Sequence, residues 1–106
     1  LAIARLRDAI GPHVQDLLRT GVSVVLDFQA NTPRARAWMK ELYEGAGAAH
    51  VLHFLDVPDD VCRARLRARN AAGTHEYDVT AADFDLFTSH FVAPQPAEGF
   101  HVRRYV

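Results

Sequence analysis

The sequence predicts an α/β fold, in which a parallel sheet lies between flanking helices in three layers. Stretches with apolar residues at helical spacing alternate with short apolar runs that are bounded by Gly or Pro. Their order is helix, strand, helix, strand, helix, which is typical of parallel strands joined by crossover helices. Because 106 residues make one domain at most, we expect residues 1–106 to form a single unit that supplies about three strands.

Composition excludes several classes of protein. A formal net charge of −1 gives no general surface for polyanions, so any nucleic-acid contact would be local, at a pocket. The single cysteine, Cys62, cannot form a disulfide within the chain, which fits a cytoplasmic protein, and it is expected to be a small core residue. No apolar run approaches the roughly 20 residues of a membrane span, so no membrane partner is expected.

Residues 1–19 have helical spacing, interrupted by Gly11 and Pro12, which predicts either a kink or two consecutive helices. A run of mostly β-branched residues follows at 22–28 and predicts a buried strand with Asp27 near its end. Since open α/β sheets bind ligands beyond the carboxyl ends of their strands, Asp27 could reach a ligand. A carboxylate that only caps the following turn is an equally good interpretation.

The next helix is predicted to begin with Thr32 as N-cap and Pro33 at the first helical position, and to end near Gly45 or Gly47. A second buried strand is predicted at 50–57, and Pro58 then opens a helix that runs to Asn70. Acidic residues occupy the first turn of this helix and arginines its later turns, as the helix dipole favours.

Four arginines on this helix can be separated by the spacing of its apolar residues, Val61, Cys62 and Leu66. Arg65 and Arg69 are predicted to project toward the buried face, and Arg63 and Arg67 away from it. Two guanidinium groups on a core side either reach past the core edge to solvent or local carboxylates, or form a cation clamp on a phosphate or carboxylate ligand.

The remainder of the chain predicts a loop, a helix and a last strand. Residues 71–78 have no periodicity and are expected to form a loop, after which Thr80 caps a helix over 81–91. The Pro-rich residues 93–99 cannot form helix or central strand, and residues 100–106 are predicted to form the final strand.

Three segments, VVLDFQANTPRARAW (24–38), LHFLDVPDDVCRARLRARN (52–70) and FVAPQPAEGF (91–100), together resemble the small P-loop ATP-binding proteins described as predicted kinases. That group is related to polynucleotide kinase, chloramphenicol phosphotransferase and zeta toxin. The resemblance covers the C-terminal part of the family's single domain, and implies ATP and Mg²⁺ as cofactors.

The resemblance also implies roles for particular residues. Asp27 matches the acid near the metal and phosphates, and Asn31 and Arg36 match polar positions on the substrate side. Arg65 and Arg69 match the arginines of the lid helix that contact the ATP phosphates. Residues 71–79 resemble the lid loop, and the segment 94–100, which contains Glu98, resembles the loop near the adenine, so Glu98 is expected to bind nucleotide or substrate.

The sequence departs from the family pattern because it contains no Gly-x-x-x-x-Gly-Lys-Ser/Thr motif. The phosphate-binding nest, its Lys and its Mg²⁺-binding hydroxyl are therefore missing from these residues. We expect a longer parent protein that lost its N-terminal part, an inactive fragment, and exposed strand edges through which copies could associate.

Three functions follow. The first is ATP-dependent phosphoryl transfer by the intact protein to an unknown acceptor, either a small molecule or a nucleic-acid end. The second is a non-catalytic module that binds nucleotide for regulation. The third is a purely structural or self-associating fragment.

Overall fold

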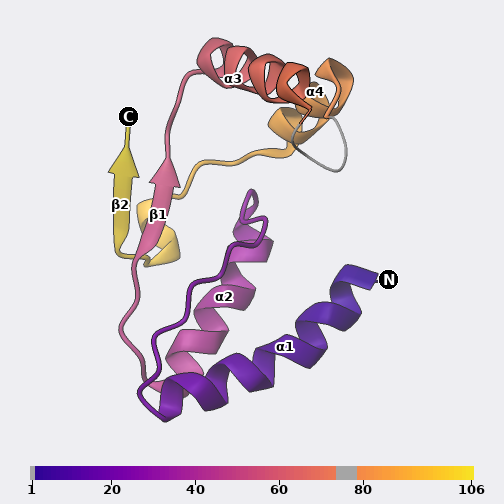
Figure 1. Ribbon diagram of the computed structural model, residues 1–106. Helices are drawn as coiled ribbons and strands as arrows, with labels where there is room; N and C mark the ends of the chain where they lie inside the picture. The colour runs from indigo at the N-terminus through magenta and orange to yellow at the C-terminus, as the bar shows by residue number, and fades with distance from the viewer. Residues whose placement is uncertain (1, 74–78) are drawn as a thin grey trace.

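The computed structural model describes residues 2–73 and 79–106. Its elements are α1 (Ala2–Arg19), α2 (Pro33–Ala46), β1 (Leu52–Leu55), α3 (Asp59–Ala72), α4 (Ala81–His90), the 3-10 helix η1 (Pro96–Glu98) and β2 (Val102–Tyr105). Figure 1 shows α1 beside α2 at one end of the molecule and α3 beside α4 at the other. Within the described ranges, no helix has both the length and the apolar character needed to cross a membrane.

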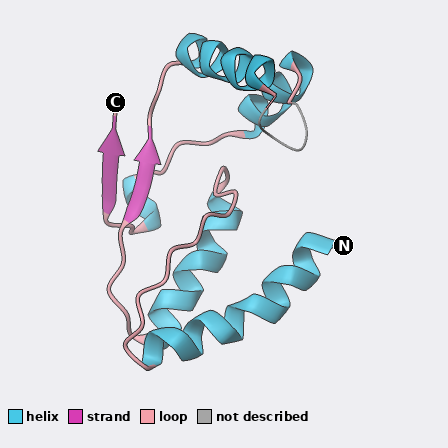
Figure 2. Cartoon of the chain, in the orientation of Figure 1, coloured by secondary structure: helices cyan, strands magenta, loops and turns pink. Residues whose placement is uncertain are grey.

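The two strands pair in parallel, with Leu52 opposite Val102 and Leu55 opposite Tyr105. Between them the chain passes through α3, α4 and η1, so the predicted parallel pairing across helical connections is confirmed (Figure 2). The described residues form a two-stranded sheet instead of the predicted three strands, and they do not complete a three-layer arrangement.

The predicted strand at 22–28 is the one that does not form. These residues have no regular secondary structure, and Val25 is 91% exposed. Val, Leu and Phe favour a pleated surface, but a strand also needs a neighbour that pairs with its backbone groups. Neither β1 nor β2 pairs with this segment.

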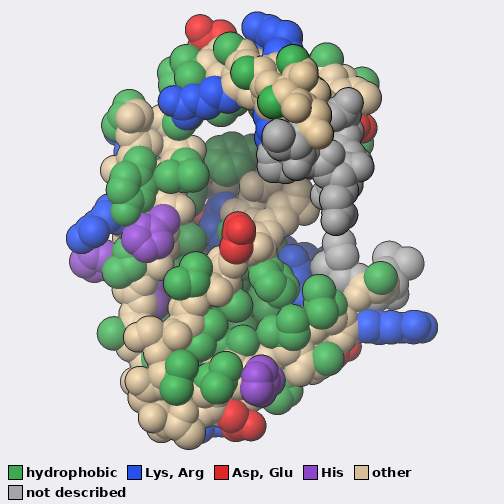
Figure 3. Space-filling model, viewed as in Figure 1, with side chains coloured by type: hydrophobic (Ala, Val, Ile, Leu, Met, Phe, Trp, Pro, Cys, Tyr) green, Lys and Arg blue, Asp and Glu red, His purple; other side chains and the backbone are tan. Residues whose placement is uncertain are grey.

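α1 continues through Pro12 as one helix, so the alternative of two consecutive helices is wrong. Pro12 removes one backbone hydrogen bond, and packing against α2 offsets that loss. A Cβ atom on Gly11 would lie 3.3 Å from Cδ2 of Leu42, which shows how closely the two helices approach. Val14 and Leu42 are buried in this contact. Figure 3 shows hydrophobic side chains gathered over the same part of the molecule.

The predicted ends of α2 are confirmed. The Thr32 hydroxyl accepts a hydrogen bond from the backbone N–H of Ala35 at 3.2 Å, and Pro33 is the first helical residue. Gly47 ends the helix in the left-handed conformation, with φ of 66°. These caps fix where the segment 22–31 enters α2.

α3 and α4 are held together by side chains. The amide of Asn70 donates to the carbonyl of Val79 at 2.7 Å, and Thr80 caps α4 with Asp83 in a reciprocal capping box. Pro58 is the N-cap of α3 and not its first helical residue. Within the predicted lid loop 71–79, the first two residues belong to α3 and Gly73 caps it, while 74–78 lie outside the described residues.

Candidate functional site

Arg65 and Arg69 lie one helical turn apart on α3, and both side chains are exposed. Neither forms an ion pair with another residue in the described ranges. Side chains four residues apart on a helix are neighbours on its surface, so the two guanidinium groups can approach one anion together. Their role toward ATP phosphates stays a prediction.

The predicted orientation of the four arginines is wrong. Arg63 is the partly buried one: its guanidinium carbon lies 4.5 Å from the centre of the Phe84 ring, and it pairs with Asp85 on α4. Arg67 lines a small cavity between α3 and α4. Arg63 occupies the interface because α4 provides the aromatic face of Phe84 and the carboxylate of Asp85. Arg65 and Arg69 are exposed to solvent instead.

Asp27 lies in the irregular segment before α2, and it is exposed. No group of three or more His, Cys, Asp or Glu side chains in the described ranges could hold a metal ion. Mg²⁺ bound together with phosphates takes only one or two carboxylates from a protein. Asp27 therefore fits a single ligand of a nucleotide-bound Mg²⁺, and does not fit a metal site made by the protein alone.

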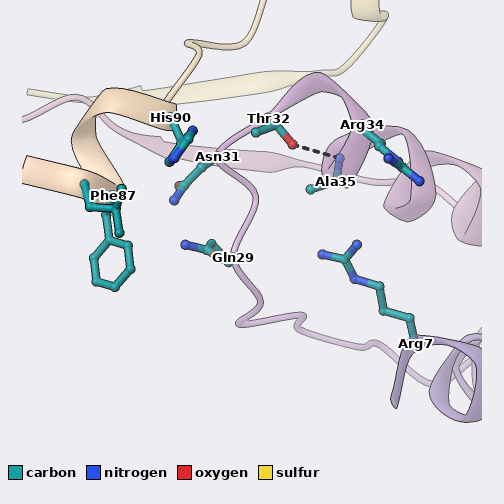
Figure 4. Close-up of a pocket in the computed structure, with 9 residues that line it drawn as sticks. Arg7, Gln29, Asn31, Thr32, Arg34, Ala35, Phe87 and His90 are labelled. Carbon is teal, nitrogen blue, oxygen red and sulfur yellow. Dashed lines mark hydrogen bonds between the residues drawn. The ribbon is translucent and has the colours of Figure 1, made fainter. Parts of the chain in front are cut away.

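Asn31 lines a cavity of about 340 Å³. The cavity is bounded by α1, the segment before α2, the first turn of α2, and α4, and its lining residues are Arg7, Gln29, Asn31, Thr32, Arg34, Ala35, Leu86, Phe87 and His90. Figure 4 shows Arg7 reaching toward the first turn of α2, and Gln29 and Asn31 directed toward the side of the cavity formed by Phe87 and His90. No Asp or Glu is among the lining residues.

Arg36 and Glu98, both predicted to bind nucleotide or substrate, bind each other. The Arg36 side chain has 0% exposure and donates from Nε to Glu98 Oε1 at 2.7 Å and from Nη2 to Oε2 at 3.1 Å. Its third nitrogen donates to the carbonyl of Ala30 at 2.8 Å. This hydrogen bonding also holds the pKa of Glu98 below its ordinary value of 4.5. Their placement makes them a structural pair, and it does not support the predicted contact with a ligand.

The sequence interpretation missed Arg7, Arg34 and His90 as cavity residues. One signal was present for Arg7, because it interrupts the apolar stripe of the first helix between Leu6 and Ile10. No pattern in the sequence connects His90 with residues more than fifty positions earlier. Only the folded chain brings α4 against the segment before α2, where the N–H of Val92 donates to the carbonyl of Asn31 at 2.7 Å.

Comparison with known proteins identifies the family. A family model described as an AAA domain matches residues 1–94. No curated protein and no solved structure gives a significant match. The resemblance to nucleotide-binding P-loop proteins is confirmed at this level, because the match spans most of the chain and agrees with its α/β arrangement. The chain belongs to the AAA domain family of nucleotide-binding P-loop NTPases.

Proposed function

We propose that the protein is an ATP-dependent phosphotransferase, and that Arg65 and Arg69 bind the phosphates of ATP. The observation that carries the proposal is the pair of exposed guanidinium groups one turn apart on α3, in a chain of the AAA domain family. Guanidinium groups donate two parallel hydrogen bonds to phosphate oxygens, so a pair of them can hold adjacent phosphates.

Charge explains what the two arginines would contribute. In phosphoryl transfer, negative charge is spread over the oxygens of the transferred group, and catalysis consists almost entirely of positioning and charge stabilisation. Positive groups directed at these oxygens stabilise the developing charge electrostatically. Arg65 and Arg69 fit this role better than Arg63, whose guanidinium is already paired with Asp85.

Asp27 would hold a Mg²⁺ ion that is bound to the ATP phosphates. Its carboxylate is exposed in the segment that leads into α2, and one carboxylate is enough when phosphate oxygens and waters complete the octahedral shell. The bound Mg²⁺ would neutralise phosphate charge. Asp27 itself would orient the ion.

The phosphate-binding loop that such a reaction needs is not among these residues, which contain no Gly-x-x-x-x-Gly-Lys-Ser/Thr sequence. We therefore expect the 106 residues alone to transfer no phosphate, since positioning by the loop supplies much of the rate. Phosphoryl transfer that uses these residues would require such a loop beside them.

The test is calorimetric titration of the protein expressed from its natural gene with ATP and Mg²⁺, together with a measurement of ADP formation. Arg65→Met and Arg69→Met remove a charge and keep most of the aliphatic stem. Each is expected to weaken ATP binding about tenfold or more, the usual effect of losing a charge-assisted hydrogen bond.

Arg67→Met is the matched control, because Arg67 is an exposed arginine on the same helix. It is expected to change ATP affinity less than about twofold, since Arg67 lines the cavity beside α4 and projects from the helix away from Arg65 and Arg69. Equal losses in all three variants, or no ATP binding by the wild-type protein, would contradict the proposal. ATP binding without ADP formation would instead favour a non-catalytic nucleotide-binding module.

A further inference from the structure

The cavity between α1, α2 and α4 is lined by positively charged and amide side chains and by apolar side chains. Arg7 and Arg34 bring positive charge to it, Gln29 and Asn31 bring amides, and none of the residues that line it is acidic. Such a lining favours a ligand that carries negative charge.

Neither cation of the cavity is neutralised by a described residue. Arg34 is exposed and forms no ion pair within the described ranges. Arg7 is partly buried, its Nε is inaccessible to solvent, and no described atom accepts a hydrogen bond from it. The Arg7 guanidinium carbon lies 5.3 Å from the centre of the Trp38 ring, which holds the group at the cavity. A buried donor without a partner costs free energy, and an anion in the cavity would provide the acceptor.

The opposite side of the cavity is apolar. Leu86 and Phe87 of α4 line it and remain 55% and 47% exposed, respectively. A large aromatic side chain beside a polar pocket can cover the flat or apolar part of a bound molecule. The volume of about 340 Å³ is at the lower end of the range for small-molecule sites.

We propose that this cavity binds the phosphoryl acceptor, and that the acceptor is a small molecule with a phosphate or carboxylate group beside an aromatic or apolar group. The anion lies between Arg7 and Arg34, and the apolar part lies against Phe87. This inference rests on the proposed function, because it names the second substrate of the same reaction. Arg65 and Arg69 do not line this cavity, so the acceptor and ATP would use different arginines.

Phenyl phosphate is a suitable probe, since it combines the two chemical features in one small molecule. Its binding to the protein expressed from the natural gene is measured by calorimetry, and the indole N–H resonance of Trp38 reports occupancy beside Arg7. We expect saturable binding with a shift of the Trp38 resonance. Arg34→Met and Arg7→Met should each raise the Kd about tenfold or more.

Arg5→Met is the matched control, because Arg5 is exposed on the same helix as Arg7 and does not line the cavity. It should leave the Kd for phenyl phosphate unchanged. Since Arg7 contacts Trp38, its replacement could disturb the fold, whereas Arg34 makes no such contact and keeps the test decisive. ATP affinity should be the same in Arg34→Met as in the wild type.

The outcomes separate this inference from the proposed function. If ATP binding depends on Arg65 and Arg69 but the Kd for phenyl phosphate is unaffected by Arg34→Met, the acceptor site is elsewhere and only this inference fails. If Arg34→Met weakens ATP and phenyl phosphate equally, the cavity belongs to the ATP site and the inference is again overturned. Phenyl phosphate binding that is lost in Arg34→Met while ATP affinity is kept supports it.

Discussion

Arg36 of α2 and Glu98 of η1, 62 residues apart in the chain, form a buried two-pronged ion pair. Lys40, one turn further along α2, donates to the backbone carbonyl of Glu98 at 2.8 Å. Two cations of one helix therefore hold the segment that leads into β2. This pair connects the α1–α2 part of the chain with the sheet.

Replacing Arg36 should lower the stability of the protein. Arg36→Met leaves the Glu98 carboxylate without its main partner in a site where it has only 15% exposure. Breaking a buried pair by removing one partner costs about 3–5 kcal/mol. Urea unfolding, monitored by circular dichroism, is expected to show a fall in the free energy of unfolding of this size.

Glu98→Gln and the double variant provide the control for that measurement. If the two side chains act on each other, the double variant loses less stability than the sum of the single variants. Strict additivity would mean that the pair contributes nothing as a pair.

Stability should also depend on pH through Glu98. Its pKa is below 4.5 in the folded protein, mainly because Arg36 hydrogen-bonds to the ionised form. The unfolded state therefore takes up a proton at a higher pH than the folded state, and the stabilisation present above 4.5 is lost as the pH falls through the lower folded pKa. Unfolding curves recorded across this range should show the loss, and Glu98→Gln should reduce it.

We expect the stability of the protein to depend on pH through His50 as well, at a higher pH than for Glu98. The Nε2 of His50 accepts a hydrogen bond from the backbone N–H of His101 at 2.9 Å, and its ring stacks on Tyr43 with centroids 3.8 Å apart. Burial, followed by the nearby His101 and Lys40, lowers the pKa of His50 below 6.5, while Glu44 opposes this shift. Because the folded state favours the neutral ring, stability should fall as the pH drops below 6.5.

Two measurements check the role of His50. An NMR titration should give its ring a pKa below 6.5, and His50→Phe, which cannot titrate, should show a smaller loss of stability in this range. A normal or raised pKa for His50 would be evidence against this account.

The strand edges give a prediction about association. β1 pairs with β2 alone within the described residues, and Leu55 at its end is 71% exposed. Unpaired edges with apolar side chains tend to pair with another chain. We expect the 106-residue chain to associate in analytical ultracentrifugation, and Leu55→Lys to shift it toward monomer. A monomer at all concentrations for the unmodified chain would disprove this.

Local signals in the sequence predicted the helices well. Thr32 with Pro33, and Thr80, mark helix starts because a capping side chain acts on backbone groups within three residues. At Pro12 the sequence left a kink and two consecutive helices open, and one helix forms because it packs against Leu42, which is 30 residues away. The strand predicted at 22–28 failed for a related reason, since β-propensity has no effect without a paired neighbour.

The candidate site was less predictable than the fold. Helical spacing predicted Arg65 and Arg69 on the buried face of α3. The residues of α3 that become buried depend on the helix that packs against it, and Arg63 lies in that contact because it pairs with Asp85 of α4. In the same way, Arg36 and Glu98 have charged side chains of the kind that bind ligands, but they bind each other although 62 positions separate them in the chain. Pairings of this kind depend on the fold, and no local pattern in the chain reveals them.

The most direct test of the central claim places the ATP phosphates relative to α3. Mn²⁺ can replace Mg²⁺ beside the phosphates, and it broadens the NMR signals of nearby nuclei. In the protein expressed from its natural gene, Mn²⁺ with ATP should broaden the side-chain signals of Arg65 and Arg69 and the amide signal of Asp27, and should leave those of Arg103 on β2 sharp. Sharp signals from Arg65 and Arg69 under conditions where ATP is bound would contradict the assignment of α3 as the phosphate-binding helix.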